Sequence, residues 1–275
     1  MVKFLSALNE AILLDLYEKG TPVPKYLHHF WAGGALSGAA FINLKKWNQK
    51  AEAAGWYQYI LTDSLVSKAF NDSMLQIQFG VLHDIGAVIV DIAQIPFSSK
   101  PIYEQLRKSV VEQGIKAKLP YLSDLARYAQ LLALGGLYVD VDVDPGTVDM
   151  REVLRTLNGI PQLGPCLRTT DSAKALGFDT LESMRTVAIL ELFSKNKLAI
   201  GNHFIAAPAR NRVVAKANEI ASKQVEEYQV TNGGIDFLKA LANLEGLGVD
   251  VTPASLPAWI WDVVWITPES DHTVD

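Results

Sequence analysis

The sequence predicts an α/β fold with a mainly parallel central sheet flanked by helices. Short apolar runs of strand length alternate with segments whose apolar residues recur at helical spacing, which is typical of a layered α/β domain. The chain of 275 residues is 49% hydrophobic and 20% charged, so it can bury the core of one large domain. We expect a single domain over 1–275, comprising an appended helix (1–20), a core (22–208) and a C-terminal helical part with a tail (209–275).

Net charge and cysteine content limit the class of protein. The net charge of −5 provides no overall basic field, so nucleic acid is not an expected partner. Cys166 is the single cysteine, which fits a reducing compartment. No apolar stretch approaches the roughly 20 residues of a transmembrane helix, and acids interrupt the N-terminal apolar run. We expect a cytoplasmic protein, or an effector secreted or translocated without an N-terminal signal peptide.

Apolar spacing predicts the individual elements. Leu5, Leu8 and Ile12 recur at helical spacing, whereas Tyr26–Trp31 has the length and composition of a strand. The β-branched run Ala87–Ile92 is either a strand or a buried segment. Helices are predicted over 4–18, 41–54, 65–83, 150–157, 180–192 and 213–228, and strands over 26–31, 57–62, 87–92 and 199–207.

The stretch around position 130 has the clearest boundaries. Ser123 is expected to cap a helix, because its hydroxyl can accept an unpaired amide of the first turn. Gly135 and Gly136 are expected to end this helix, because glycine adopts left-handed conformations without steric cost. Residues 137–139 then form a short strand that leads directly into an acidic run starting at Asp140.

The acidic run is the strongest chemical signal. Asp140, Asp142 and Asp144 alternate with valines, so an extended chain would place the three carboxylates on one face. Their mutual repulsion is relieved by a divalent cation, and carboxylate oxygens suit Mg²⁺ or Mn²⁺. The run also leaves a strand, at the edge where α/β sheets place ligands.

Three interpretations of this run compete. The first is a solvated acidic turn. The second is a calcium loop, but counting from Asp140 the sixth position is Pro145 and the twelfth is Arg151, where such loops carry glycine and glutamate. The third is a metal site that binds a diphosphate, where the cation stabilises the leaving group as a sugar departs. We favour the third interpretation.

Asp124 and Arg127 support a sugar site. They lie three residues apart and therefore share a helix face. Alone, the pair would be a weak surface ion pair. Next to the acidic run, the two side chains could hold sugar hydroxyls, with Arg127 also near a phosphate.

These motifs resemble a known family. Residues 122–128 (LSDLARY) and 134–142 (LGGLYVDVD) are similar to the S-D-x-x-R-x helix and G-G-x-Y-x-D-x-D pattern of the DXD sugar transferases. That family includes the catalytic domains of large clostridial glucosylating toxins and yeast-type initiating mannosyltransferases. Residues 23–31 (VPKYLHHFW), 43–47 (NLKKW) and 201–208 (GNHFIAAP) resemble further segments of the family.

The resemblance implies a GT-A fold, a retaining transfer and a role for each matched residue. Trp31 would stack on the nucleotide base, and Asp142 would ligate the metal. Asp140 would contact ribose and sugar hydroxyls, with Tyr138 among the donor-binding residues, and Asn202 would approach the transferring sugar. Asp124 and Arg127 would hold the donor sugar. His28 matches the strand histidine of the family and is expected, with His29, to be structural.

The acidic tail is a weaker match. The toxin domains close their metal site with a C-terminal segment that carries an acid, a serine and a tryptophan. Trp265, Glu269 and Asp271 form a comparable cluster here, although their spacing and order differ. Glu269 or Asp271 could therefore reach the metal, or the tail could be a frayed terminus.

The sequence therefore predicts a Mn²⁺- or Mg²⁺-dependent glycosyltransferase with a UDP-sugar donor. A protein acceptor is the first choice, with a host small GTPase as one candidate, and a lipid or oligosaccharide acceptor is the second. Two rivals are a non-catalytic nucleotide-sugar-binding module and a carboxylate–metal phosphohydrolase.

Overall fold

A seven-stranded sheet forms the centre of the computed structural model, which describes residues 21–146, 148–151, 155–156, 162–169, 200–228 and 265–268. The strand order is β4-β3-β2-β5-β8-β7-β9. Neighbours are parallel from β4 to β5 and between β7 and β9, whereas β8 runs antiparallel to β5 and β7. This confirms the predicted mainly parallel sheet. The strands are β2 (Tyr26–Trp31), β3 (Tyr57–Thr62), β4 (Val88–Asp91), β5 (Gly136–Val139), β7 (Gln162–Thr169), β8 (Ile200–Ala207) and β9 (Trp265–Pro268).

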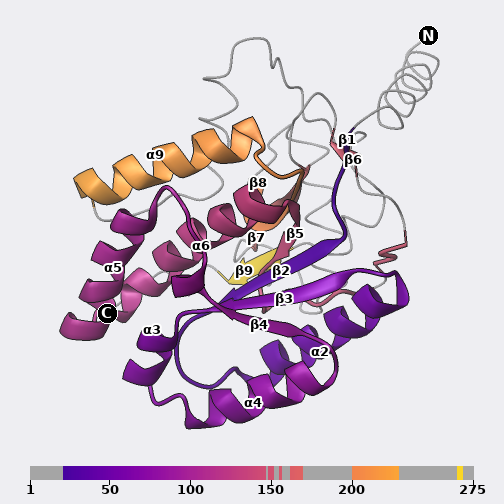
Figure 1. The fold of residues 1–275 in the computed structure, drawn as a ribbon, viewed down its shortest axis with the longest axis horizontal. Helices are drawn as coiled ribbons and strands as arrows, with labels where there is room; N and C mark the ends of the chain where they lie inside the picture. The colour runs from indigo at the N-terminus through magenta and orange to yellow at the C-terminus, as the bar shows by residue number, and fades with distance from the viewer. Residues whose placement is uncertain are drawn as a thin grey trace.

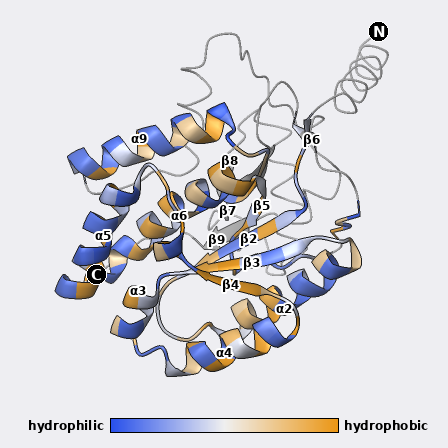
Figure 2. Cartoon of the chain, in the orientation of Figure 1, coloured by the Kyte–Doolittle hydropathy of each residue, from blue (hydrophilic) through white to orange (hydrophobic). Residues whose placement is uncertain are grey.

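Helices cover both faces of this sheet (Figure 1). Helices α2 (Gly38–Ala53) and α4 (Ser73–Asp84) pack on one face. Helices α5 (Lys100–Gln113), α6 (Leu119–Leu134) and α9 (Arg212–Tyr228) pack on the other. The outer sides of α2, α5 and α9 are largely hydrophilic, whereas α4 exposes Met74, Ile77 and Val81 (Figure 2). The short helix α3 (Ser64–Ala69) follows β3, and no described helix is long and apolar enough to cross a bilayer.

The side chains of strand β5 pack into the apolar clusters on both faces of the sheet. Leu137 and Val139 point into the cluster that contains Trp47 of α2. Tyr138 points to the opposite side, into the cluster formed with α6 and α9. Alternate side chains of a strand face opposite ways, so a strand between two helical layers is apolar at successive positions.

Strand order reverses between β2 and β5. From β2 the chain moves outward to β3 and β4, and it then returns to place β5 against the other side of β2. The crevice outside the carboxyl ends of two such strands is where open α/β sheets bind ligands. Trp31 ends β2 and Asp140 follows β5, so the topology brings these two predicted site residues to one crevice.

Several predicted boundaries are wrong for local reasons. The helix expected over 65–83 is two helices, because Asn71 adopts a left-handed conformation with φ of 60° between α3 and α4. Helix α6 begins at Leu119, with a proline in its first turn, so Ser123 lies inside it and is not its cap. Helix α5 was not predicted. The helices expected over 4–18 and 180–192 lie outside the described residues.

The helix expected over 150–157 is also wrong where the structure describes it. Residues Arg155–Thr156 form strand β6, which pairs antiparallel with β1 (Thr21–Pro22). This pairing joins positions more than a hundred residues apart, so local apolar spacing carried no sign of it. The predicted strands at 26–31, 57–62 and 199–207 and the helix at 213–228 are confirmed to within a residue at each end.

Candidate active site

The acidic run is a tight turn rather than a continued strand. The Asp140 amide donates to the His203 carbonyl at 2.9 Å, which extends the pairing with β8 by one residue. The Val143 amide then donates back to the Asp140 carbonyl at 3.2 Å. Val141 and Val143 are buried, whereas Asp142 is exposed. The expectation of three carboxylates on one extended face is therefore wrong.

Asp144 has turned away toward α2. Its Oδ2 lies 2.6 Å from the Lys46 ammonium, and its Oδ1 accepts the Gly146 amide at 2.8 Å. Asp142 is thus exposed, whereas Asp144 is paired with Lys46 of helix α2.

Asp140 connects the turn to helix α6. Its Oδ1 accepts a hydrogen bond from the Tyr138 hydroxyl at 2.8 Å and lies 3.2 Å from Nη2 of Arg127. The side chain is 23% exposed, and for Oδ2 the described residues supply no hydrogen bond or ion pair. Asp140 can therefore hold Arg127 with one oxygen and offer the other to a ligand.

Arg127 lies between two carboxylates in a buried position. Its Nη2 is 3.3 Å from Asp124 and donates to the Ser123 hydroxyl at 2.9 Å, and the guanidinium lies 4.7 Å from the centre of the Tyr138 ring. Burial alone would lower the pKa of Arg127, but the charge of Asp140 and its other neighbours outweighs this effect and raises it above its ordinary value. Arg127 is therefore a permanent positive charge.

Tyr138 is a neutral donor in this network. Its side chain is fully buried, and burial together with the charge of Asp140 raises its pKa well above the ordinary value despite the opposing effect of Arg127. The phenol therefore keeps its proton, which it shares with Asp140. Ser123, first read as a helix cap, instead contacts the Tyr138 hydroxyl at 3.2 Å.

Two buried histidines support the strand beneath the site. His28 Nε2 donates to the Gly135 carbonyl and His29 Nδ1 to the Val139 carbonyl, each at 2.7 Å. Burial lowers the pKa of His28 to about 4 and that of His29 to about 3, so both are neutral at pH 7. Their position is consistent with a structural role.

Trp31 ends β2, and Asp140 follows the neighbouring parallel strand β5. The Trp31 ring is partly buried against the apolar cluster beneath α2 and α4, and its Nε1 donates to the Gly34 carbonyl at 2.9 Å. This bond restrains the orientation of the ring.

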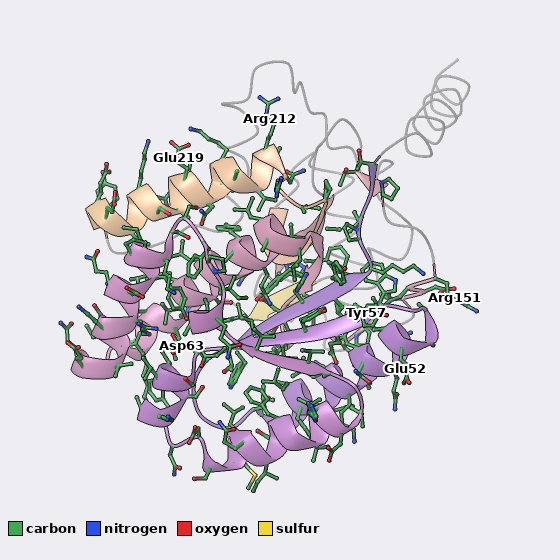
Figure 3. All side chains as sticks on the ribbon, in the orientation of Figure 1. Glu52, Tyr57, Asp63, Arg151, Arg212 and Glu219 are labelled. Atoms are coloured by element: carbon green, nitrogen blue, oxygen red, sulfur yellow. The ribbon has the colours of Figure 1, made fainter. Side chains whose placement is uncertain are left out.

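Two residues near the site, Trp47 and Asp63, were not predicted from the sequence. Trp47 of α2 donates its indole N–H to the Val143 carbonyl at 2.8 Å. Asp63 follows β3 at the same sheet edge as Asp140, and Figure 3 shows it at the opposite end of β3 from Tyr57. Asp63 is buried, accepts amides of the first turn of α3 and the Tyr103 hydroxyl, and is thereby occupied as a structural cap.

The remaining predicted residues are only partly described. Asn202 lies in β8, but its side chain is outside the described residues, as are Glu269 and Asp271. Within the described part of the chain, no three His, Cys, Asp or Glu side chains gather as a ready metal site. A cation here would take Asp142 and the second oxygen of Asp140 as its protein ligands from that part.

A comparison with protein families matches the part of the chain that contains this site. Residues 43–149 match the family model described as "Glycosyltransferase sugar-binding region containing DXD motif". The predicted resemblance to DXD glycosyltransferases is confirmed. The matched segment includes most of α2 and all of α6, β5 and the acidic turn, so it contains the whole network around Arg127. Comparison with curated proteins finds no match.

Solved structures show the fold. A structure described as "PaToxG Glycosyltransferase" superposes with a TM-score of 0.56 at 18% identity, covering 86% of this chain and 75% of that one. The ligand-free glycosyltransferase domain from the YGT toxin gives a TM-score of 0.44 at 13% identity, covering 81% and 68%. The catalytic domain of alpha-toxin from Clostridium novyi gives 0.43 at 11%, covering 86% and 67%. The superposition on PaToxG shows the fold, which is the GT-A type predicted from the sequence.

Proposed function

We propose that this chain is a metal-dependent retaining glycosyltransferase. It takes a hexose or N-acetylhexosamine from a nucleotide-diphosphate sugar, uridine-linked by preference, and transfers it to an acceptor hydroxyl. The observation that carries the proposal is the exposed Asp142 on a turn whose neighbour Asp140 is bound to Arg127 at the reversal point of the sheet. In this proposal Trp31, at the end of the adjacent strand β2, faces the same crevice as Asp142 and Arg127.

The available oxygens suit Mn²⁺ or Mg²⁺. These cations are commonly bound through one or two carboxylates plus substrate phosphates, and Asp142 with the second oxygen of Asp140 supplies that number. When bound, the cation supplies positive charge against the leaving diphosphate. Glu269 or Asp271 would add a further ligand in this proposal.

Each residue of the network would act on the donor. Trp31 would stack against the base, because an aromatic face suits any nucleobase. Arg127 and Asp124 would hold sugar hydroxyls and Asn202 would approach the transferring sugar. Asp140 would bind ribose or sugar hydroxyls through the oxygen that Tyr138 leaves unoccupied. Tyr138 is fully buried, so it would act on the donor through Asp140.

The ion pairs that Asp124 and Asp140 form with Arg127 favour a front-face transfer. Asp124 and Asp140 both lie within 3.3 Å of Arg127, and an ion-paired carboxylate is a poor nucleophile. The acceptor oxygen would form its bond to the anomeric carbon on the face that the diphosphate leaves. The acceptor proton would pass to the departing diphosphate oxygen, so configuration is retained without a covalent enzyme intermediate.

A protein hydroxyl is the proposed acceptor, by analogy with the toxin branch of the family. Incubation with purified host small GTPases on one side and with glycan or lipid acceptors on the other, each with labelled donor, separates the two classes. Label in the GTPase band supports the proposal, and label only in glycan or lipid replaces it with the alternative.

Donor hydrolysis tests the core of the proposal. Turnover of UDP- and GDP-sugars is measured with and without Mn²⁺ for the native chain, Asp142→Asn and the control Asp149→Asn. Asp149 is an acid of the same loop that pairs with Arg151 at 2.7 Å on the surface. We expect Mn²⁺-dependent hydrolysis that only Asp142→Asn abolishes. Unchanged turnover in Asp142→Asn would refute the site, and binding without turnover would favour a non-catalytic module.

A further inference from the structure

We infer that Trp47 of helix α2 is a positioning residue that sets the place of the Asp142 carboxylate. The inference deepens the proposed function, because it concerns the metal ligand of that same site. Trp47 lies 95 positions before Asp142 in the sequence. Its contact with the acidic turn therefore exists only in the folded chain.

The turn is bracketed by two carbonyl groups that the core holds. On its N-terminal side, His29 Nδ1 donates to the Val139 carbonyl at 2.7 Å. On its C-terminal side, Trp47 Nε1 donates to the Val143 carbonyl at 2.8 Å. The two rings are themselves in contact, with centres 6.4 Å apart. Residues 140–142 therefore span a gap whose two ends are attached to one buried aromatic pair.

Trp47 is well suited to hold one end of this gap. It is fully buried, so its ring is confined by packing and its N–H has a defined direction. A buried indole N–H and a buried carbonyl each require a partner, and here they satisfy one another. The bond therefore resists displacement by water more strongly than the exposed contacts of the same helix.

The neighbouring lysines extend this contact along α2. Lys46 pairs with Asp144, and Lys50 donates to the Val148 carbonyl at 2.8 Å. The Lys46 and Asp144 side chains are 47% and 39% exposed, and ion pairs of this kind contribute little. Among Lys46, Trp47 and Lys50, we therefore assign the position of the turn to Trp47.

Positions 140 and 143 are also linked to each other. The Val143 amide donates to the Asp140 carbonyl, and the Asp140 side chain is bound by Tyr138 and Arg127. Asp142 is the most exposed residue of this closed unit. Loss of the Trp47 bond would free the C-terminal end of the unit and let the Asp142 carboxylate sample positions unsuited to a metal ligand.

Trp47→Phe tests the inference, because it removes the N–H and keeps most of the ring. The matched control is Trp56→Phe: Trp56 is also buried and donates its indole N–H to the Met150 carbonyl at 2.8 Å, eight residues beyond Asp142. Three quantities are measured for native chain and variants: the melting temperature, Mn²⁺ affinity by electron paramagnetic resonance, and amide exchange of peptides covering 139–146.

We expect both variants to melt at lower temperature and only Trp47→Phe to alter the turn. Its Mn²⁺ dissociation constant should rise about tenfold, the usual scale for a group that orients a metal ligand. Its amides at 140–143 should exchange faster than those of Trp56→Phe. Donor KM at saturating Mn²⁺ should remain near the native value.

The outcomes separate the two proposals. Equal Mn²⁺ affinity and equal exchange at 140–143 in the two variants would show that Trp47 merely packs the core, and would leave the proposed function intact. A native chain that binds no Mn²⁺ and hydrolyses no donor would instead overturn the proposed function. The exchange measurement would still decide whether Trp47 holds the turn.

Discussion

Arg127 and Asp140 form an ion pair of 3.2 Å that joins helix α6 to the end of strand β5. The helix packs on one face of the sheet and the strand lies within it, so the pair ties the two layers together at the crevice. Arg127 also lies 3.3 Å from Asp124, so one guanidinium contacts a carboxylate of its own helix and a carboxylate at the end of β5.

Replacement of Arg127 by lysine should impair turnover more than folding. Lysine keeps the charge but cannot make the forked contacts to Ser123, Asp124 and Asp140 at once. We expect kcat for donor hydrolysis to fall about 100-fold, the usual scale for loss of one preorganised donor. Arg151→Lys is the control, because the exposed Arg151 makes a forked contact to Asp149 on the surface and its loss should leave kcat nearly unchanged. Native kcat in Arg127→Lys would contradict the role.

Trp31→Ala should weaken donor binding. Base–aromatic stacking is worth about 1–3 kcal/mol per base, so donor KM should rise roughly 5- to 150-fold with a smaller change in kcat. Trp31→Phe retains an aromatic face and should recover most of the affinity, although it loses the bond to the Gly34 carbonyl. A donor KM that stays at the native value in Trp31→Ala would exclude the stacking role.

Acid should destabilise the fold through its two neutral histidines. The pKa values of His28 and His29 are lowered to about 4 and about 3 by burial, whereas an unfolded histidine titrates near 6.5. Below pH 6.5 the unfolded chain binds protons that the folded chain does not, so stability falls as pH falls toward 4. From pH 7 to pH 5 the two groups should lower the free energy of unfolding by roughly 4 kcal/mol.

Denaturant unfolding across this pH range measures the effect. His28→Gln places an amide where Nε2 donates to the Gly135 carbonyl, and it should remove about half of the pH dependence. His83→Gln is the control, because the His83 side chain is 74% exposed and should leave the dependence unchanged. Equal pH slopes in all three proteins would show that the buried histidines are not the cause.

Gly136→Ala should be strongly destabilising. Gly136 has φ of 112°, and an added Cβ would collide with the Tyr26 carbonyl and lie 3.0 Å from His28 Nε2. Backbone strain and overpacking together should cost about 3 kcal/mol in unfolding free energy. Gly80→Ala is the opposite case: Gly80 lies in α4 with nothing within 4 Å of an added Cβ, so it should stabilise by about 0.5–1 kcal/mol. Similar melting temperatures for both variants would contradict this assignment.

Local chemistry made much of this site predictable. Asp124 and Arg127 share a helix face because of their spacing, and Gly135 and Gly136 mark the end of that helix because glycine tolerates left-handed backbone. The short apolar run Leu137–Val139 between a glycine pair and the acidic run was sufficient to predict the buried strand that leads to Asp140. Each of these features depends on residues close together in the chain.

The shape of the acidic run was not predictable in the same way. An alternating Asp-Val pattern is compatible with a strand, but the strand pairing stops at the bond from Asp140 to His203, and the bond from Trp47 to Val143 holds the turn that follows. The same applies to Asp144, which pairs with Lys46 on a distant helix. These contacts join positions 60 to 100 residues apart.

The sequence by itself determined the α/β layering, the buried strand at 137–139 and the set of charged residues that could bind a diphosphate sugar. Only the tertiary structure decided that Asp142 is exposed, that Asp144 pairs with Lys46, and that the neighbouring strands leading to Trp31 and Asp140 lie at the reversal of strand order. The physical reason is that periodicity and turn chemistry act over a few residues, whereas the direction of a side chain in a loop depends on partners that folding brings together.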